Sequence, residues 1–237
     1  MENPDCRILI ENIAIAHHAI AELLMEIYPV GSQKMDFVHN MCWQANRDIK
    51  GSLFLAMSGR YSGASVIQRG VLEKVAYAID MLDDLDEDLE KGWQRVIEWL
   101  NGEKTASPSG EEIADILSSC SPHISKIIHT SFEENREFRN ERVHTIKGDQ
   151  ILNVLLKDEN KRKPWLVNIN ESKLVGWYVG SVTDLFIFLT VILDIFEVES
   201  VPNSTKYIAD LYHEIQNKEC NGIISDHSLS VDPENWD

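Results

Sequence analysis

Arg139, Asn140 and His144 are the residues of this chain whose types and spacing suggest a chemistry. An imidazole can transfer a proton near neutral pH. A guanidinium can hold a phosphate through two parallel hydrogen bonds. Together these groups suit cleavage of a phosphodiester bond without a metal ion.

The segment is more specific than its arginine–histidine spacing alone. An arginine followed four to six residues later by a histidine arises readily by chance in a chain of this composition. Asn140 directly after Arg139, and the position of the motif near the end of a predicted helix before Gly148, make a chance match less frequent.

The elements that must position these residues are predicted to be helices, because apolar residues recur at three- and four-residue spacing through most of the chain. Ser121 and Pro122 suit the first turn of the motif helix, with the serine as cap and the proline at the first helical position, and Gly148 suits its end. The other predicted helices span residues 8–27, 33–57 (loosened near Gly51), 61–82 after a break at 58–59, a helix from the acidic run 83–88 to just before Asn101, a short helix after the loop 105–110, 174–195 and 204–218.

Helical spacing fails between residues 151 and 168, where we expect a small β-hairpin or an extended loop. We find no internal repeat and no linker long enough to separate domains, so we expect one helical domain over residues 1–220 and a loose tail over 221–237. The predicted fold class is all-α: a helical bundle with an extra helical N-terminus and a long apolar C-terminal helix.

The composition limits the location and the partners of the protein. The chain has 237 residues and a formal net charge of −17, so its surface as a whole repels nucleic acid and anionic membranes. Contact with nucleic acid would need a locally basic cleft or a basic partner. The four cysteines are widely spaced, which argues against structural zinc and a disulfide framework and favours a reducing cytoplasm. The N-terminus has no signal-peptide pattern.

The apolar stretch 174–195 has the length of a membrane span. However, Asp184 interrupts its middle and Asp194 its far end, each at a cost of about 2.5–3.5 kcal/mol in a membrane, and no cluster of lysine or arginine flanks it. We therefore expect a buried helix or a dimerisation helix, in a cytoplasmic protein without a membrane partner.

The motif resembles the signature of the HEPN superfamily, in which a histidine follows an arginine by four to six residues and a polar residue often follows the arginine directly. Arg139, Asn140 and His144 match that signature position by position. Residues 61–73 look like the HEPN helix that carries Arg-x-x-x-Glu among small and apolar residues, here Arg69 and Glu73. The likeness covers residues 59–148 in outline and assigns no subfamily.

The resemblance implies a metal-independent endoribonuclease that needs no cofactor and works as a homodimer or higher homo-oligomer. Such enzymes belong to bacterial toxin–antitoxin, abortive-infection and CRISPR-linked defence systems, so RNA is the implied substrate and an antitoxin or defence protein an implied partner. His144 would take the proton of a ribose 2′-hydroxyl or protonate the leaving 5′-oxygen, Arg139 would stabilise charge on the phosphorane, and Asn140 would orient the histidine or the phosphate. Two motifs meeting at a two-fold interface would supply both acid and base, and leave a 2′,3′-cyclic phosphate.

Arg69 and Glu73 are four residues apart, a spacing that favours an ion pair within one helix; the resemblance implies that they support Arg139. HEPN toxins silenced by nucleotide transfer carry a tyrosine two positions after the histidine. Ile146 stands at that position, so we do not expect this mode of control. A catalytically inactive HEPN-like dimerisation or binding module is the first alternative, and the net charge of −17 suits it.

A di-metal helical-bundle enzyme is the second alternative. A carboxylate followed three residues later by a histidine puts both ligands on one helix face, as in di-iron bundles. The chain contains eight histidines and 39 acidic residues, so such spacings also arise readily by chance. Three pairs have this spacing: Asp36 with His39, Glu141 with His144, and Asp210 with His213.

Overall fold

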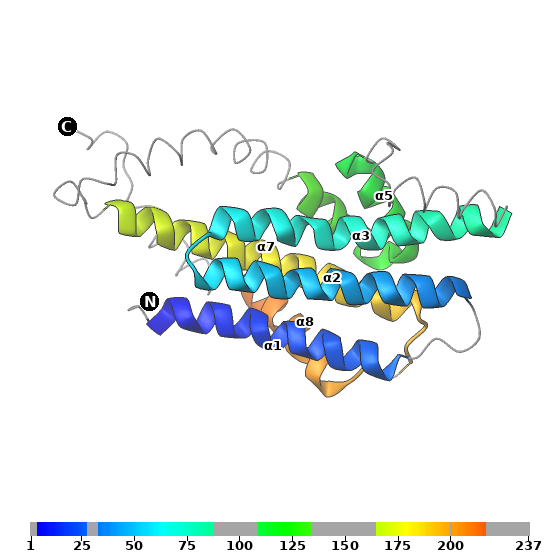
Figure 1. Ribbon diagram of the computed structural model, residues 1–237, viewed down its shortest axis with the longest axis horizontal. Helices are drawn as coiled ribbons and strands as arrows, with labels where there is room; N and C mark the ends of the chain where they lie inside the picture. Colours follow the sequence, from blue (N-terminus) through cyan, green and yellow to red (C-terminus); the bar gives the residue numbers. More distant parts are fainter. Residues whose placement is uncertain (1–3, 28–32, 88–108, 134–164, 200, 217–237) are drawn as a thin grey trace.

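A computed structural model describes residues 4–27, 33–87, 109–133, 165–199 and 201–216. Four long helices run lengthwise through the molecule (Figure 1): α1 (Pro4–Glu26), α2 (Gln33–Met57), α3 (Tyr61–Glu87) and α7 (Trp165–Ile195). Among the shorter elements, α5 (Gly110–Cys120) packs on α3 and α7, α8 (Asn203–Gln216) packs on α1 and α7, and the 3₁₀ turn η1 (Pro122–Ile124) leads into helical residues 125–133. No strand occurs within these ranges, and the all-α prediction is confirmed.

The helix starting in the acidic run 83–88 was predicted wrongly. Residues 83–87 continue α3 instead. Residues 71–87 contain no glycine and no proline, so no helix-breaking residue interrupts the backbone hydrogen bonds of α3 there. These acidic residues therefore do not begin a new helix, and the helix-start dipole argument does not apply to them.

Two further boundary predictions need correction. α2 is continuous through Gly51, whose Cα faces Ile67 of α3; a Cβ built there would lie 3.9 Å from the Ile67 side chain. Residues 165–168 are the first turn of α7 rather than part of a hairpin. Pro164 directly before them suits a helix start, because proline needs no hydrogen-bond partner for its nitrogen. The remainder of the predicted hairpin or loop lies outside the described ranges.

The break predicted at residues 58–59 is confirmed as a helix-terminating turn. The backbone N–H of Arg60 donates to the carbonyl of Leu55 at 2.8 Å, and that of Gly59 donates to Ala56 at 2.9 Å. This pair of bonds is the Schellman motif, which requires a left-handed residue after the helix. Gly59 meets that requirement with a φ of 74°, so α2 ends and α3 packs back against it.

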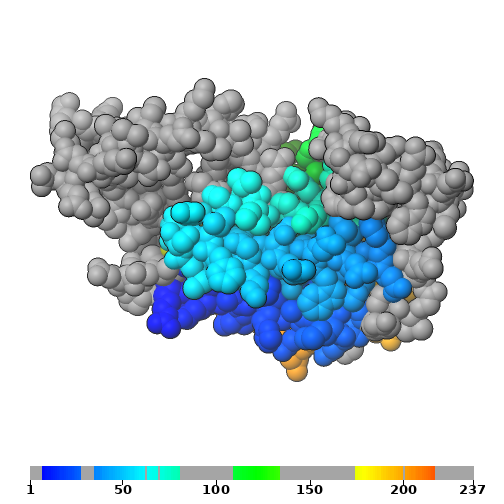
Figure 2. Space-filling view, in the orientation of Figure 1, coloured from blue at the N-terminus to red at the C-terminus, as the bar shows by residue number. Residues whose placement is uncertain are grey.

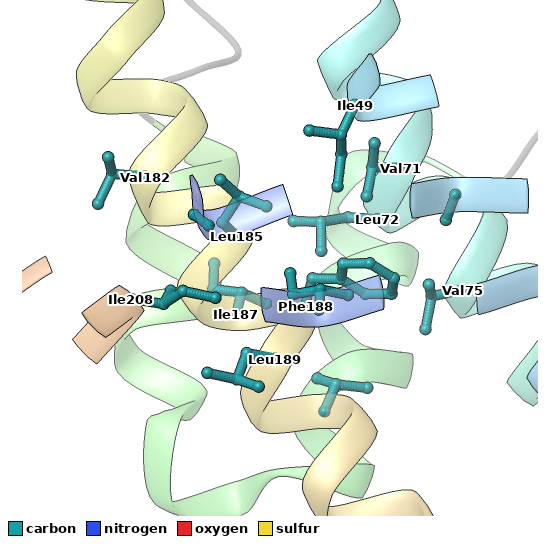
Figure 3. Close-up of a cluster of buried hydrophobic side chains, with 14 of the residues drawn as sticks. Ile49, Val71, Leu72, Val75, Val182, Leu185, Ile187, Phe188, Leu189 and Ile208 are labelled. Carbon is teal, nitrogen blue, oxygen red and sulfur yellow. The ribbon is translucent and has the colours of Figure 1, made fainter. Parts of the chain in front are cut away.

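The hydrophobic core lies between the long helices, with α7 contributing to it over much of its circumference (Figure 3). Phe188 and Trp177 of α7 are almost fully buried. Cys42 of α2 is also buried, and burial raises the pKa of its thiol to about 12. The part of the core drawn in the close-up includes Ile49, Val71, Leu72, Val75, Val182, Leu185, Ile187, Phe188, Leu189 and Ile208.

Buried polar side chains tie α7 to its neighbours. The Trp177 indole Nε1–H donates to Ser52 Oγ at 3.0 Å, and the Ser52 hydroxyl donates to the Ala64 carbonyl at 2.9 Å, so α2, α3 and α7 share one polar link. A second link joins α7 to α1 and α8: Asn12 Nδ2 donates to the Tyr178 hydroxyl at 3.1 Å, and the Tyr207 hydroxyl donates to Asn12 Oδ1 at 2.8 Å. These bonds fix how α7 sits against α1 and α8.

Two helices are long and apolar enough to cross a membrane by length and composition: residues 7–26 of α1 and residues 174–195 of α7. Each turns a row of buried side chains into the bundle, including Ile13 and Ile20 in α1 and Leu185 and Phe188 in α7. The expectation that 174–195 is a buried helix is therefore met for the face that packs on α1, α3, α5 and α8.

Candidate functional site

The motif residues Arg139, Asn140, Glu141 and His144 lie outside the part of the chain that the structure describes, as do Gly148 and the tail 221–237. Their roles stay predictions. The structure does show the approach to them, because residues 125–133 are helical and end six residues before Arg139.

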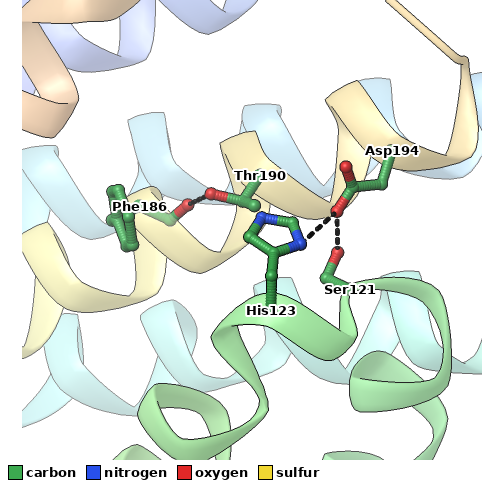
Figure 4. Close-up of polar contacts among 5 residues, drawn as sticks. All are labelled: Ser121, His123, Phe186, Thr190 and Asp194. Atoms are coloured by element: carbon green, nitrogen blue, oxygen red, sulfur yellow. Dashed lines mark hydrogen bonds and ion pairs between the residues drawn. The ribbon is translucent and has the colours of Figure 1, made fainter.

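The start of this approach helix differs from the prediction at Ser121. Pro122 is the first residue of η1, as predicted, but the Ser121 side chain makes no capping hydrogen bond. Its hydroxyl instead donates to Asp194 Oδ2 at 2.5 Å, and His123 Nδ1 lies 3.7 Å from the same oxygen (Figure 4). Ser121 is fully buried, and the carboxylate at the end of α7 is the acceptor that packing brings to it. The contact therefore attaches η1 to α7.

Ser121, His123 and Asp194 are the residue types of a serine-hydrolase triad, but their arrangement differs from one. In a triad the histidine lies between the serine and the carboxylate and accepts the serine proton. Here the carboxylate lies between the other two, and the serine hydroxyl donates directly to it (Figure 4). This geometry positions a backbone turn and does not activate a nucleophile.

A second contact holds the approach helix to α5. His129 Nε2 lies 3.6 Å from Asp115 Oδ1, so the two groups form an ion pair when the histidine is protonated. α5 itself begins with a capping box, in which Ser109 and Glu112 satisfy each other's backbone N–H groups. Residues 122–133 therefore contact α7 at η1 and, when His129 is protonated, form an ion pair with α5 further along.

Arg69 and Glu73 both lie in α3, where their four-residue spacing places them on one face of the helix. Glu73 is half-buried. Gln68, the neighbour of Arg69, is buried, and its side-chain amide has no hydrogen-bond partner among the described residues. The supporting role that the resemblance implies for Arg69 and Glu73 stays a prediction.

The described members of the proposed di-metal site do not form a metal-binding group. His39 Nε2–H donates to the Leu24 carbonyl at 2.8 Å, and its ring packs edge-on against Trp43 and Phe196. That nitrogen is already used in holding α1 to α2. Asp36, Asp210 and His213 are exposed. Within the described ranges, no three histidine, cysteine, aspartate or glutamate residues gather where they could hold a metal ion.

No protein-family model, curated protein or solved structure matches this chain. The proposal about function below therefore rests on the residues of the motif and their resemblance to HEPN proteins.

Proposed function

We propose that this protein is a metal-independent endoribonuclease of the HEPN type, acting in a bacterial toxin–antitoxin or anti-phage defence system. The observation that carries the proposal is the sequence Arg139-Asn140-x-x-x-His144. In this proposal two copies of the chain bring their motifs together, and His144 from each copy serves as acid or base.

Two features of the described residues support the proposal. The fold is all-α, as the resemblance implies. The helical residues that precede the motif in sequence contact the bundle through Asp194 and, when His129 is protonated, through Asp115. Catalysis by positioned side chains needs such support, because an error of about 1 Å in placement can reduce the rate a hundredfold.

Incubation of the purified full-length protein with cellular RNA in EDTA tests this proposal. We expect cleavage products that end in a 2′,3′-cyclic phosphate, and we expect His144→Ala to abolish them. Loss of a general acid or base lowers the rate by about 10²–10⁴-fold. His213→Ala is the matched control, because His213 is an exposed histidine of α8 outside the motif.

The outcome separates the proposal from its two alternatives. Cleavage that requires an added divalent metal and fails in His213→Ala would support the di-metal enzyme. RNA that stays intact with wild-type protein, together with equal growth of cells expressing wild type and His144→Ala, would support the inactive module and contradict the nuclease.

The composite site predicts a dependence on protein concentration. If two protomers complete one site, activity per protomer must fall as dilution splits the dimer. We expect this fall at the same concentrations at which analytical ultracentrifugation detects monomers. Constant activity per protomer across that range would show that one chain carries a complete site.

A further inference from the structure

Positive charge is concentrated in one part of this acidic chain. Residues 37–72 contain four basic residues and a single acid, Asp48, and so have a net charge of +3, whereas the whole chain has −17. The basic residues in this stretch are Arg47, Lys50, Arg60 and Arg69. A local reversal of sign on this scale can attract a polyanion that the rest of the surface repels.

Two of these cations share the outer face of α2 with two apolar side chains. Arg47, Lys50, Phe54 and Met57 follow one another at spacings of three, four and three residues, which places them along one side of a helix. All four are exposed, Phe54 at 62%. Arg60 is exposed in the turn that follows α2. We name these five residues the α2 stripe; Figure 2 shows the side of the molecule that α1, α2 and the first part of α3 form.

Three acidic residues of α1 and α2 lie against basic side chains of their own. Asp48 is bonded to Lys74 of α3. On α1, Glu11 pairs with Arg7 at 2.6 Å, and Glu22 lies 3.4 Å from His18. The cations of the stripe itself form no ion pair with any described residue. Within the described part of the chain, nothing therefore competes with a ligand for these charges.

The pKa of His17 in α1 also responds to the charge of Lys50. Burial, followed by the charge of Lys50, lowers the pKa of His17 below its ordinary value of 6.5. The charge of Lys50 therefore acts on a side chain of the neighbouring helix.

Exposed cations next to an exposed aromatic ring match the chemistry of single-stranded nucleic acid. Arginine and lysine neutralise phosphates, and an aromatic face stacks on a base. The stripe is about 15 Å long from Arg47 to Met57, at 1.5 Å per helical residue. A purely acidic peptide such as poly-glutamate would use the cations but would leave Phe54 without a partner.

We propose that the α2 stripe binds single-stranded RNA, with Arg47, Lys50 and Arg60 on phosphates and Phe54 stacked on a base. This inference rests on the proposed function, because it assigns a docking surface to the RNA that the motif would cut. The stripe is a binding surface apart from the motif.

Fluorescence anisotropy with a labelled single-stranded RNA of about 12 nucleotides tests the surface. The protein is the full-length His144→Ala variant, so the probe is not cut. The test variant adds Arg47→Gln and Lys50→Gln. The matched control adds Lys126→Gln and Lys206→Gln, which removes two charges from exposed lysines outside α2.

We expect the Arg47→Gln/Lys50→Gln variant to bind about tenfold more weakly at low salt, and its slope of log K against log salt to fall by about 1.4, or 0.7 for each lost phosphate contact. The control pair should leave both quantities unchanged. Equal weakening in the two variants would overturn the proposal, because it would show a response to net charge alone.

Phe54→Ala tests the stacking contact separately. We expect about tenfold weaker RNA binding from Phe54→Ala, since a stacked base contributes about 1–3 kcal/mol, and no change from Ile15→Ala, an exposed apolar residue of α1. Poly-glutamate should compete poorly. An unchanged affinity in Phe54→Ala, or poly-glutamate that competes as well as unlabelled RNA, would overturn the RNA assignment in favour of an acidic protein partner.

The failure of this inference and the failure of the proposed function are distinguishable. Wild-type protein that cuts RNA, combined with undiminished RNA binding by the Arg47→Gln/Lys50→Gln variant, would overturn the stripe and leave the nuclease intact. Wild-type protein that never cuts RNA, combined with binding lost in that variant alone, would support the stripe as a binding surface and contradict the nuclease.

Discussion

α2 and α7 belong to one bundle and are joined by the Trp177–Ser52 hydrogen bond, but they expose their surfaces very differently. α7 packs on α1, α3, α5 and α8. The hydroxyls of its Thr183 and Thr190 donate to backbone carbonyls of the same helix four residues earlier. α2 buries one face and leaves the opposite face to Arg47, Lys50, Phe54 and Met57. The two helices therefore have different tasks. α7 supplies stability, and α2 leaves a surface on which a ligand can bind.

The same substitution on each helix gives the sharpest test of this difference. Phe188→Ala should lower the free energy of unfolding by about 3–5 kcal/mol, because it leaves a cavity in the core. Phe54→Ala should change it by no more than about 0.5 kcal/mol, because Phe54 is exposed. Urea unfolding followed by circular dichroism measures both. Similar losses in the two variants would contradict the division between the helices.

The polar link between the helices should give the next largest effect. Ser52→Ala removes the acceptor of the buried Trp177 indole N–H and the donor to the Ala64 carbonyl. We expect a loss of about 1–3 kcal/mol, the usual result of leaving a buried polar group unsatisfied. A double-mutant cycle with Trp177→Phe isolates the bond, and additive losses would show that it contributes no coupling between α2 and α7.

The ends of the two helices form a second matched pair. Both end in a Schellman motif: Gly59 is the left-handed residue after α2, and Glu197, with a φ of 48°, holds that place after α7, where the Val198 N–H donates to Leu193. Gly59→Ala should destabilise by about 1–2 kcal/mol, because alanine is strained at positive φ. Glu197→Gly should stabilise by about 1 kcal/mol for the same reason. Thermal unfolding measures both, and equal signs would refute this account.

The smallest expected effect concerns the pKa of His17 beside the α2 stripe. Because burial and then Lys50 lower this pKa in the folded state, the unfolded chain binds the proton more readily. The contribution of neutral His17 to the stability of the fold is therefore complete above pH 6.5. It is lost as the pH falls through the lower pKa that His17 has in the folded protein. Lys50→Gln should raise the His17 pKa in an NMR titration. Lys206→Gln should leave it unchanged, and a shift of equal size there would show that the field is not local.

Local patterns predicted much of the fold because their causes are local. The apolar spacing of α2 and the glycine at position 59 act within a few residues, and both predictions are confirmed. The acidic run 83–87 was misplaced because charge favours a helix start only where the backbone actually begins a helix, and here α3 simply continues. Ser121 looked like a cap, but a carboxylate 73 residues away is its partner.

The candidate site divides in a similar way. The motif at residues 139–144 is a string of neighbouring residue types, so it can be predicted from the sequence, and its role stays a prediction. The proposed α2 stripe does not follow from the net charge of −17, which predicts that the surface as a whole repels nucleic acid. A count of charge over short windows would have shown the basic stretch 37–72. It would not have shown which of its cations face outward or which acids are already paired.

The sequence by itself determined the helical class, the ends of α2 and the chemistry that Arg139, Asn140 and His144 would perform if brought together. These follow from periodicity, from backbone preference and from functional groups, which each residue carries with it. Only the tertiary structure decided that Asp194 accepts the Ser121 hydrogen bond and that His39 donates to the Leu24 carbonyl. It also decided that Arg47 and Lys50 have no ion-pair partner among the described residues. Partners distant in sequence are chosen by packing, which no single segment specifies.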